Sequence, residues 1–236
     1  MVNRISQPGP KLEGGSHWTW HAISPATADD PDAAAWVRVF HQGHHCPTAT
    51  FRRRFGPLLR FDHHTGHISR PAECSEGRTI IYLARNLGTA LAEVFGDETT
   101  ATICPNYRVG LVHVEEDCRV QDLTGNGAMA IGALPQLTTG ALSRKESQAW
   151  ARAIHRDEPA GRPIEGIHYR SAHDEGHCLA LFERAPNLWE VPRGGHAAKG
   201  WALLDIVERV TNLLYERRVR FSEIPSSECD RCKSGV

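Results

Sequence analysis

Histidines and cysteines are the residues of this chain whose types and spacing come nearest to a metal site. His63, His64 and His67 lie close together, and the C-terminal segment carries the pair Cys229-x-x-Cys232. Zinc sites combine such residues at short, regular spacings, and neither group has a second set of ligands beside it in the sequence. We therefore interpret the histidines as part of a solvated polar loop and the cysteine spacing as accidental, and we predict no metal site.

The common phosphate-binding and nucleophile motifs are missing from the sequence. There is no G-x-G-x-x-G after a predicted strand, no G-x-x-x-x-G-K-[ST] and no G-x-S-x-G. The chain has 27 basic and 28 acidic side chains and a formal net charge of −1. It therefore lacks the overall positive charge expected of a protein that binds nucleic acid directly.

The cellular compartment is indicated by two further features. Residues 1–20 contain no apolar run of signal-peptide length, and no other stretch is long enough to span a membrane. The seven cysteines, an odd number at irregular spacings, do not resemble a disulfide framework. We expect a cytoplasmic protein without a membrane partner; its oligomeric state stays open, a homodimer included.

The stretch from Arg60 to Glu93 positions the most informative polar side chains. Within it, Thr79–Ala84 is apolar and rich in β-branched residues, which predicts a buried strand. Asn86 is the expected N-cap of a following helix, whose apolar stripe is formed by Leu87, Leu91, Val94 and Phe95. Glu93 lies almost opposite this stripe, so its carboxylate faces either bulk water or a cleft, and the periodicity leaves these two alternatives open.

Short strands alternate with helices along the rest of the chain. Strands are predicted at Trp36–His41, Tyr107–Val114, Arg119–Leu123, Gly166–Ser171 and Cys178–Glu183, the last two as neighbours. The Ser143-x-x-Glu146 spacing predicts a capped helix that ends before Pro159, and Trp201–Arg218 is predicted as a closing helix. The pattern favours a single mixed α/β (α+β) domain over residues 31–220, with a loosely ordered segment at 1–30 and a flexible tail at 221–236.

Three separated blocks of the sequence resemble one known family. They are Arg60-Phe-Asp, then a strand ending Tyr82-Leu-Ala followed by Thr-Ala-Leu-Ala-Glu93-Val-Phe, and then Gly-Ile-x-Tyr-x-Ser171 followed by Ala-Leu-Phe-Glu-Arg. Over residues 36–185 this arrangement resembles the RES domain, a family named for an Arg, a Glu and a Ser. The matching positions are Arg60, Glu93 and Ser171, with Tyr82 as the tyrosine at the strand end.

The resemblance implies a fold, an activity and a partner. RES domains resemble ADP-ribosyltransferases, with small mixed sheets flanked by helices around a cleft. Characterised members destroy NAD by splitting the nicotinamide–ribose bond, some with phosphate as acceptor and others with water or a protein side chain. Many are toxins neutralised by an antitoxin with an Xre-like DNA-binding region. NAD is thus the expected substrate, phosphate the expected co-substrate, and no cofactor is implied. One departure from the family pattern is Arg170-Ser171 in place of the common Ser-Ser pair.

The chemistry of the matched side chains suits this reaction. Splitting the bond passes through an oxocarbenium-like sugar, which the carboxylate of Glu93 would stabilise. Arg60 would hold the pyrophosphate or the attacking phosphate through its planar guanidinium. Tyr82 would contact nicotinamide or ribose, and Ser171 would donate a hydrogen bond to a phosphate or an amide. Arg38, Arg53 and Arg54 are further candidate anion ligands.

Other functions remain open at this point. The same residues would serve an NAD hydrolase or an enzyme that transfers ADP-ribose to a protein. A catalytically silent module of the same fold that binds a partner protein is the alternative from another class. The resemblance favours an NAD phosphorylase, and the reaction requires no covalent nucleophile.

Overall fold

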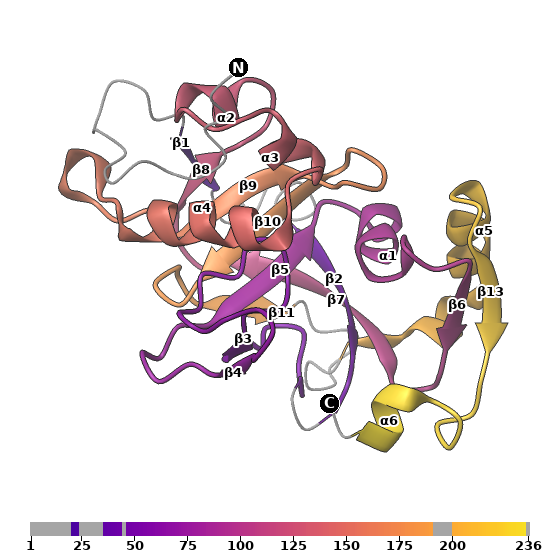
Figure 1. The fold of residues 1–236 in the computed structure, drawn as a ribbon. Helices are drawn as coiled ribbons and strands as arrows, with labels where there is room; N and C mark the ends of the chain where they lie inside the picture. Colours follow the sequence, from indigo (N-terminus) through magenta and orange to yellow (C-terminus); the bar gives the residue numbers. More distant parts are fainter. Residues whose placement is uncertain (1–19, 24–34, 44–45, 191–199, 235–236) are drawn as a thin grey trace. The chain divides into compact units, whose positions relative to one another are not determined.

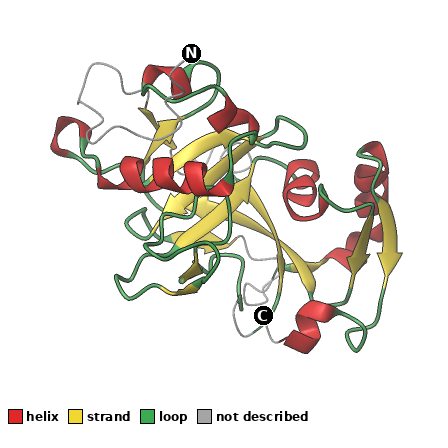
Figure 2. Ribbon diagram, viewed as in Figure 1, coloured by secondary structure: helices red, strands yellow, loops and turns green. Residues whose placement is uncertain are grey.

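The fold is mixed α/β, as predicted (Figures 1 and 2). The structure, a computed structural model, describes residues 20–23, 35–43, 46–190 and 200–234. Most of the segment 1–30, predicted to be loosely ordered, lies outside the described residues. The chain forms two compact units, the first from residues 1–24, 52–82 and 116–187 and the second from 25–51, 83–115 and 188–236. Each unit is assembled from three separate segments and is described by itself below.

Among the described residues, four strands of a mixed sheet lie wholly in the first unit. β1 (Trp20–Ile23) is antiparallel to β8 (Cys118–Asp122), and β8 is parallel to β9 (Gly166–Arg170). β9 in turn is antiparallel to β10 (His177–Phe182), which confirms that these two predicted strands are neighbours. Their short connecting loop therefore stands at one end of the sheet.

Helices of the first unit connect the parallel strands β8 and β9. They are α2 (Gly127–Ala130), α3 (Gln136–Thr139), α4 (Arg144–Arg156) and the 3-10 turn η1 (Pro159–Gly161). The side chain of Ser143 accepts from the backbone N–H of Glu146, and the Glu146 carboxylate accepts from that of Ser143, so the predicted capping box is confirmed. α4 lies across the sheet (Figure 2) and buries Trp150 and Ile154.

Three short strands frame the segment that carries Arg60. β3 (Phe55–Gly56) pairs with β4 (Ala72–Glu73), which closes the base of the loop between them. β5 (Ile80–Ala84) follows and confirms the predicted strand. It belongs to both units, since Ile80 pairs with Arg53 in the first and Ala84 with Val37 in the second.

The second unit is organised around β7 (Tyr107–Val114). β2 (Trp36–His41) pairs with β7 along its whole length, and both strands have their predicted bounds. β11 (Leu188–Glu190) and β12 (Trp201–Ala202) also pair with β7. α1 (Leu87–Phe95) follows β5, and the Asn86 side chain accepts from the N–H of Thr89 at 2.9 Å, as its predicted role of N-cap requires.

One prediction for the C-terminal third is wrong. The helix expected at Trp201–Arg218 is shorter, because Gly200 turns the chain with φ +67° and Trp201 then pairs with β7. It consists of the 3-10 turn η2 (Leu203–Ile206) and α5 (Val207–Glu216).

The tail at 221–236 contains regular structure, and its flexibility stays a prediction. β13 (Arg220–Glu223) pairs in parallel with β6 (Thr100–Ile103), a strand that the sequence analysis did not predict. The chain then forms α6 (Asp230–Ser234), drawn in yellow near the C-terminus in Figure 1. Among the described residues, no helix has the length and apolar character needed to cross a membrane.

Candidate functional site

Arg60 lies beside the loop between β9 and β10. Its Nη2 donates to the carbonyl oxygens of Thr138 at 3.1 Å and Arg170 at 3.3 Å. The guanidinium carbon lies 4.6 Å from the ring centre of Phe61 and 4.9 Å from that of Tyr169. The buried Nε has no hydrogen-bond partner among the described residues. These contacts fix the position and orientation of the guanidinium.

The close packing of the chain against Arg60 depends on Gly140. This residue is the C-cap of α3 and has φ +75°. A Cβ at this position would lie 3.0 Å from Nη1 of Arg60 and 2.6 Å from the Cβ of Ala172. Glycine therefore allows the left-handed turn and the close contact together.

The hydroxyl of Tyr82 makes hydrogen bonds with the two residues that follow Arg60. The hydroxyl donates to Oδ1 of Asp62 at 2.8 Å and accepts from the N–H of Phe61 at 3.0 Å. Burial and the Asp62 carboxylate raise the pKa of Tyr82 well above its ordinary value. The hydroxyl thus stays protonated, and its proton is directed to Asp62. In this arrangement Tyr82 fixes the backbone next to Arg60.

The Asp62 carboxylate accepts the hydrogen bonds that hold the segment around Arg60 together. The sequence analysis assigned this residue no role. Its fully buried carboxylate binds Nη2 of Arg53 with both oxygens, at 2.9 and 2.8 Å. It also accepts from the N–H groups of Leu58 at 2.6 Å and Leu59 at 3.0 Å. Arg53 is therefore engaged in holding the loop. Arg54 is exposed, 3.8 Å from Glu73.

Ser171 closes the turn after β9. Its side chain is buried, and its Oγ accepts from the N–H of His173 at 3.2 Å. Its own N–H donates to the carbonyl oxygen of Gly176 at 2.8 Å. The preceding residue, Arg170, supplies the carbonyl oxygen that Arg60 binds. The structure therefore brings Arg60, Tyr82 and Ser171 together in the first unit.

Glu93 and Arg38 belong to the second unit. Glu93 lies on α1 with its side chain exposed, whereas Thr89, one turn earlier, is buried. Arg38 lies on β2, and its Nη1 donates to the carbonyl oxygens of Ala49 at 2.9 Å and Phe51 at 2.6 Å. Arg38 therefore supports a loop of its own unit, and its role as an anion ligand stays a prediction.

The interpretation of the histidines as a solvated loop is wrong for His63 and His64, which are fully buried. Nε2 of His63 lies 2.7 Å from Oε2 of Glu183, and Nε2 of His155 lies 2.6 Å from Oε1 of the same carboxylate. Both rings thus contact the carboxylate directly, as a hydrogen-bonded triad. His67 is exposed, as expected, with Nδ1 2.7 Å from Oγ of Ser69.

Burial governs the protonation of this triad. It lowers the pKa of His63 to about 4, against the opposing effect of the hydrogen bond to Glu183. Burial alone would raise the pKa of Glu183, but the hydrogen bonds from His155 and His63 hold it far below its ordinary value. His63 is therefore neutral and Glu183 ionised at neutral pH.

Acid should destabilise the protein through His63. Between about pH 6.5 and 4 the unfolded chain protonates this histidine while the folded chain does not. The stability of the folded state is therefore unaffected by His63 above pH 6.5 and decreases as the pH falls toward 4. We expect a loss of about 2–3 kcal/mol of unfolding free energy. Urea unfolding at several pH values measures it. His63→Gln should flatten this slope, while His67→Gln should keep it; equal slopes for the two variants would contradict the assignment.

Comparison with known proteins yields one match. The model of a family described as the RES domain matches residues 35–204, which confirms the resemblance noted over residues 36–185. The matched range includes Arg60, Tyr82, Glu93 and Ser171. No curated protein and no solved structure matches the chain.

Proposed function

Because the chain belongs to the RES-domain family, a family of NAD-degrading toxins, we propose that it is an NAD phosphorylase. It splits NAD at the nicotinamide–ribose bond and yields nicotinamide and ADP-ribose phosphate. It acts in the cytoplasm as the toxin of a toxin–antitoxin pair, and an Xre-type antitoxin protein neutralises it. The family match over residues that include Arg60, Tyr82, Glu93 and Ser171 is the observation that carries this proposal.

The reaction requires one residue that stabilises positive charge and one that binds an anion. As the N-glycosidic bond breaks, its electron pair goes to the nicotinamide nitrogen and positive charge develops on the ribose. The Glu93 carboxylate stabilises that charge and binds the ribose hydroxyls. A phosphate oxygen then forms the new bond to the anomeric carbon. Arg60 binds an anionic group, either the NAD pyrophosphate or the attacking phosphate.

The surroundings of Arg60 support its part in this proposal. The contacts to Thr138 and Arg170 fix the guanidinium plane, and the two aromatic rings hold it from the side. The Nε atom is enclosed, so an anion would bind through the other N–H groups of the guanidinium.

Product analysis tests the reaction class. The purified protein is incubated with NAD in the presence and absence of inorganic phosphate, and nicotinamide and the ADP-ribose product are followed by mass. Phosphate-dependent release with a phosphorylated product supports the proposal. Phosphate-independent release of ADP-ribose would replace it with a hydrolase, and mass added to a protein would replace it with an ADP-ribosyltransferase. NAD binding without turnover would indicate a silent binding module.

Replacing Arg60 with lysine should lower kcat/KM for NAD or for phosphate about 10- to 100-fold. Lysine keeps the charge but loses the planar array of donors that binds an anion and two carbonyl oxygens together. Steady-state kinetics with each substrate varied in turn identifies the affected anion. Arg220→Lys is the matched control, since Arg220 is exposed on β13 and is not a candidate anion ligand. Unchanged kinetics in Arg60→Lys would remove Arg60 from the site.

A further inference from the structure

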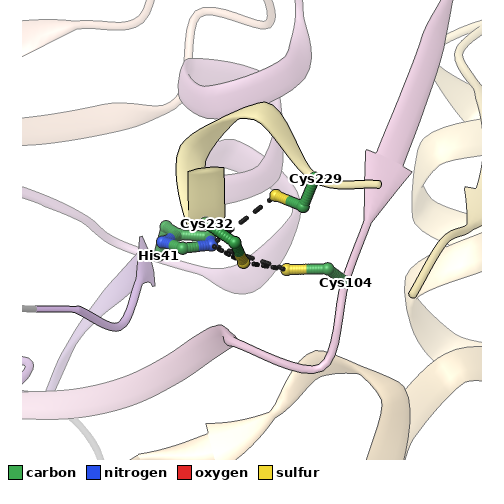
Figure 3. A group of neighbouring side chains, drawn as sticks. All are labelled: His41, Cys104, Cys229 and Cys232. Atoms are coloured by element: carbon green, nitrogen blue, oxygen red, sulfur yellow. Dashed lines mark hydrogen bonds between the residues drawn. The ribbon is translucent and has the colours of Figure 1, made fainter. Parts of the chain in front are cut away.

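Four potential metal ligands converge in the second unit (Figure 3). His41 ends β2, Cys104 directly follows β6, and Cys229 and Cys232 lie at the start of α6 and within it. Nε2 of His41 lies 3.3 Å from the sulfur of Cys232, 3.5 Å from that of Cys104 and 3.7 Å from that of Cys229. The sulfurs of Cys104 and Cys232 are 3.7 Å apart.

These distances match the edges of a tetrahedron around a zinc ion. Zinc binds cysteine sulfur at about 2.3 Å and histidine nitrogen at about 2.0–2.1 Å. Tetrahedral angles then give about 3.8 Å between two sulfurs and about 3.6 Å between sulfur and nitrogen. The same distances are far too long for disulfide bonds, whose sulfurs lie about 2.05 Å apart. All four side chains can therefore reach one ion.

Hydrogen-bond donors lie beside the sulfurs. Nδ2 of Asn106 donates to the sulfur of Cys232 at 3.3 Å. The backbone N–H of Asn106 donates to Cys104, and those of Arg231 and Cys232 donate to Cys229. Such donors surround the sulfur ligands of metal sites and disperse their negative charge.

Three of the four ligands are buried. His41 is 7% exposed, Cys104 is fully buried and Cys229 is 4% exposed, while Cys232 is half-buried. The His41 ring packs edge-on against Tyr107, with ring centres 5.1 Å apart, which holds Nε2 toward the sulfurs. Four protein ligands with little solvent access are typical of structural zinc, whereas catalytic zinc keeps one position open.

We propose that His41, Cys104, Cys229 and Cys232 bind one Zn²⁺ in a structural Cys3His site. Thiolate and imidazole ligands in this ratio favour zinc over magnesium or calcium. The ion ties α6 to the ends of β2 and β6 and so fixes the C-terminal segment. Cys229 and Cys232 lie beyond the residues that the family model matches, and the proposal does not depend on NAD chemistry.

Metal analysis of the full chain tests this site. Protein purified under reducing conditions without added chelator should contain about one zinc per chain by elemental mass spectrometry. Cys104→Ser and Cys229→Ser should each lose that zinc. Cys74→Ser is the matched control, because Cys74 is a partly exposed thiol outside the cluster, and it should retain the zinc. Folded wild-type protein without zinc would overturn the proposal, as would zinc retained in both cluster variants.

A second measurement uses only the wild-type chain, so it does not depend on how the variants fold. Removal of zinc by a chelator should lower Tm and expose the segment around α6 to proteases, and zinc, but not magnesium, should reverse both effects. Cobalt in place of zinc should give the charge-transfer absorption of three thiolates. A Tm and proteolysis pattern that chelation leaves unchanged, or a disulfide among Cys104, Cys229 and Cys232, would refute the site.

Discussion

Replacing Glu93 with glutamine should lower the rate of NAD cleavage about 100- to 1,000-fold, the range found when a stabilising group is removed from a transition state. The amide keeps the volume of the side chain but cannot offset positive charge on the ribose. Glu93 is exposed on α1, away from the buried stripe, so Tm should stay within a degree or two of the wild-type value. Single-turnover kinetics and thermal unfolding measure the two effects.

Glu98→Gln is the matched control for this experiment. Glu98 is also exposed and lies just beyond the end of α1, so its replacement makes the same chemical change nearby. It should leave the rate of NAD cleavage unchanged. Wild-type activity in Glu93→Gln would remove Glu93 from the mechanism, and equal losses in both variants would indicate a general effect of surface charge.

Asp62→Asn should cost about 3–5 kcal/mol of unfolding free energy, the largest stability effect that we expect in this chain. The buried carboxylate accepts from Arg53, two backbone N–H groups and Tyr82. An amide offers one acceptor oxygen and leaves Arg53 without its counter-charge in a poorly solvated position. Chemical denaturation measures the loss, and activity should fall with it because this network positions the backbone beside Arg60.

Asp117→Asn tests whether the effect is specific to Asp62. Asp117 is exposed in the turn before β8, and its replacement should change the unfolding free energy by less than about 0.5 kcal/mol. A similarly small change in Asp62→Asn would mean that the hydrogen bonds to its carboxylate contribute little to stability.

Elements determined by local sequence were predictable. The N-cap Asn86, the capping box at Ser143 and the alternating pattern of Tyr107–Val114 all act between residues close in the chain, and the structure has them as predicted. Family resemblance supplied the rest of the candidate site, because nothing local distinguishes Glu93 from any other exposed helix glutamate.

Features that depend on distant residues were missed. The role of Asp62 is not visible in the sequence, because its donors come from Arg53, the Leu58 turn and Tyr82. Likewise, the sulfur of Cys104 and the imidazole of His41 meet across 63 residues, and Cys229 meets His41 across 188. The Cys229-x-x-Cys232 spacing was the available signal, but its partners are visible only once β2, β6 and α6 are in place.

Nicotinamide release from NAD by the wild-type protein in phosphate buffer tests the central claim most directly. We predict stoichiometric release of nicotinamide with ADP-ribose phosphate as the second product, and almost none from Glu93→Gln under the same conditions. Intact NAD after prolonged incubation with folded wild-type protein, or equal release by the two proteins, would contradict the account.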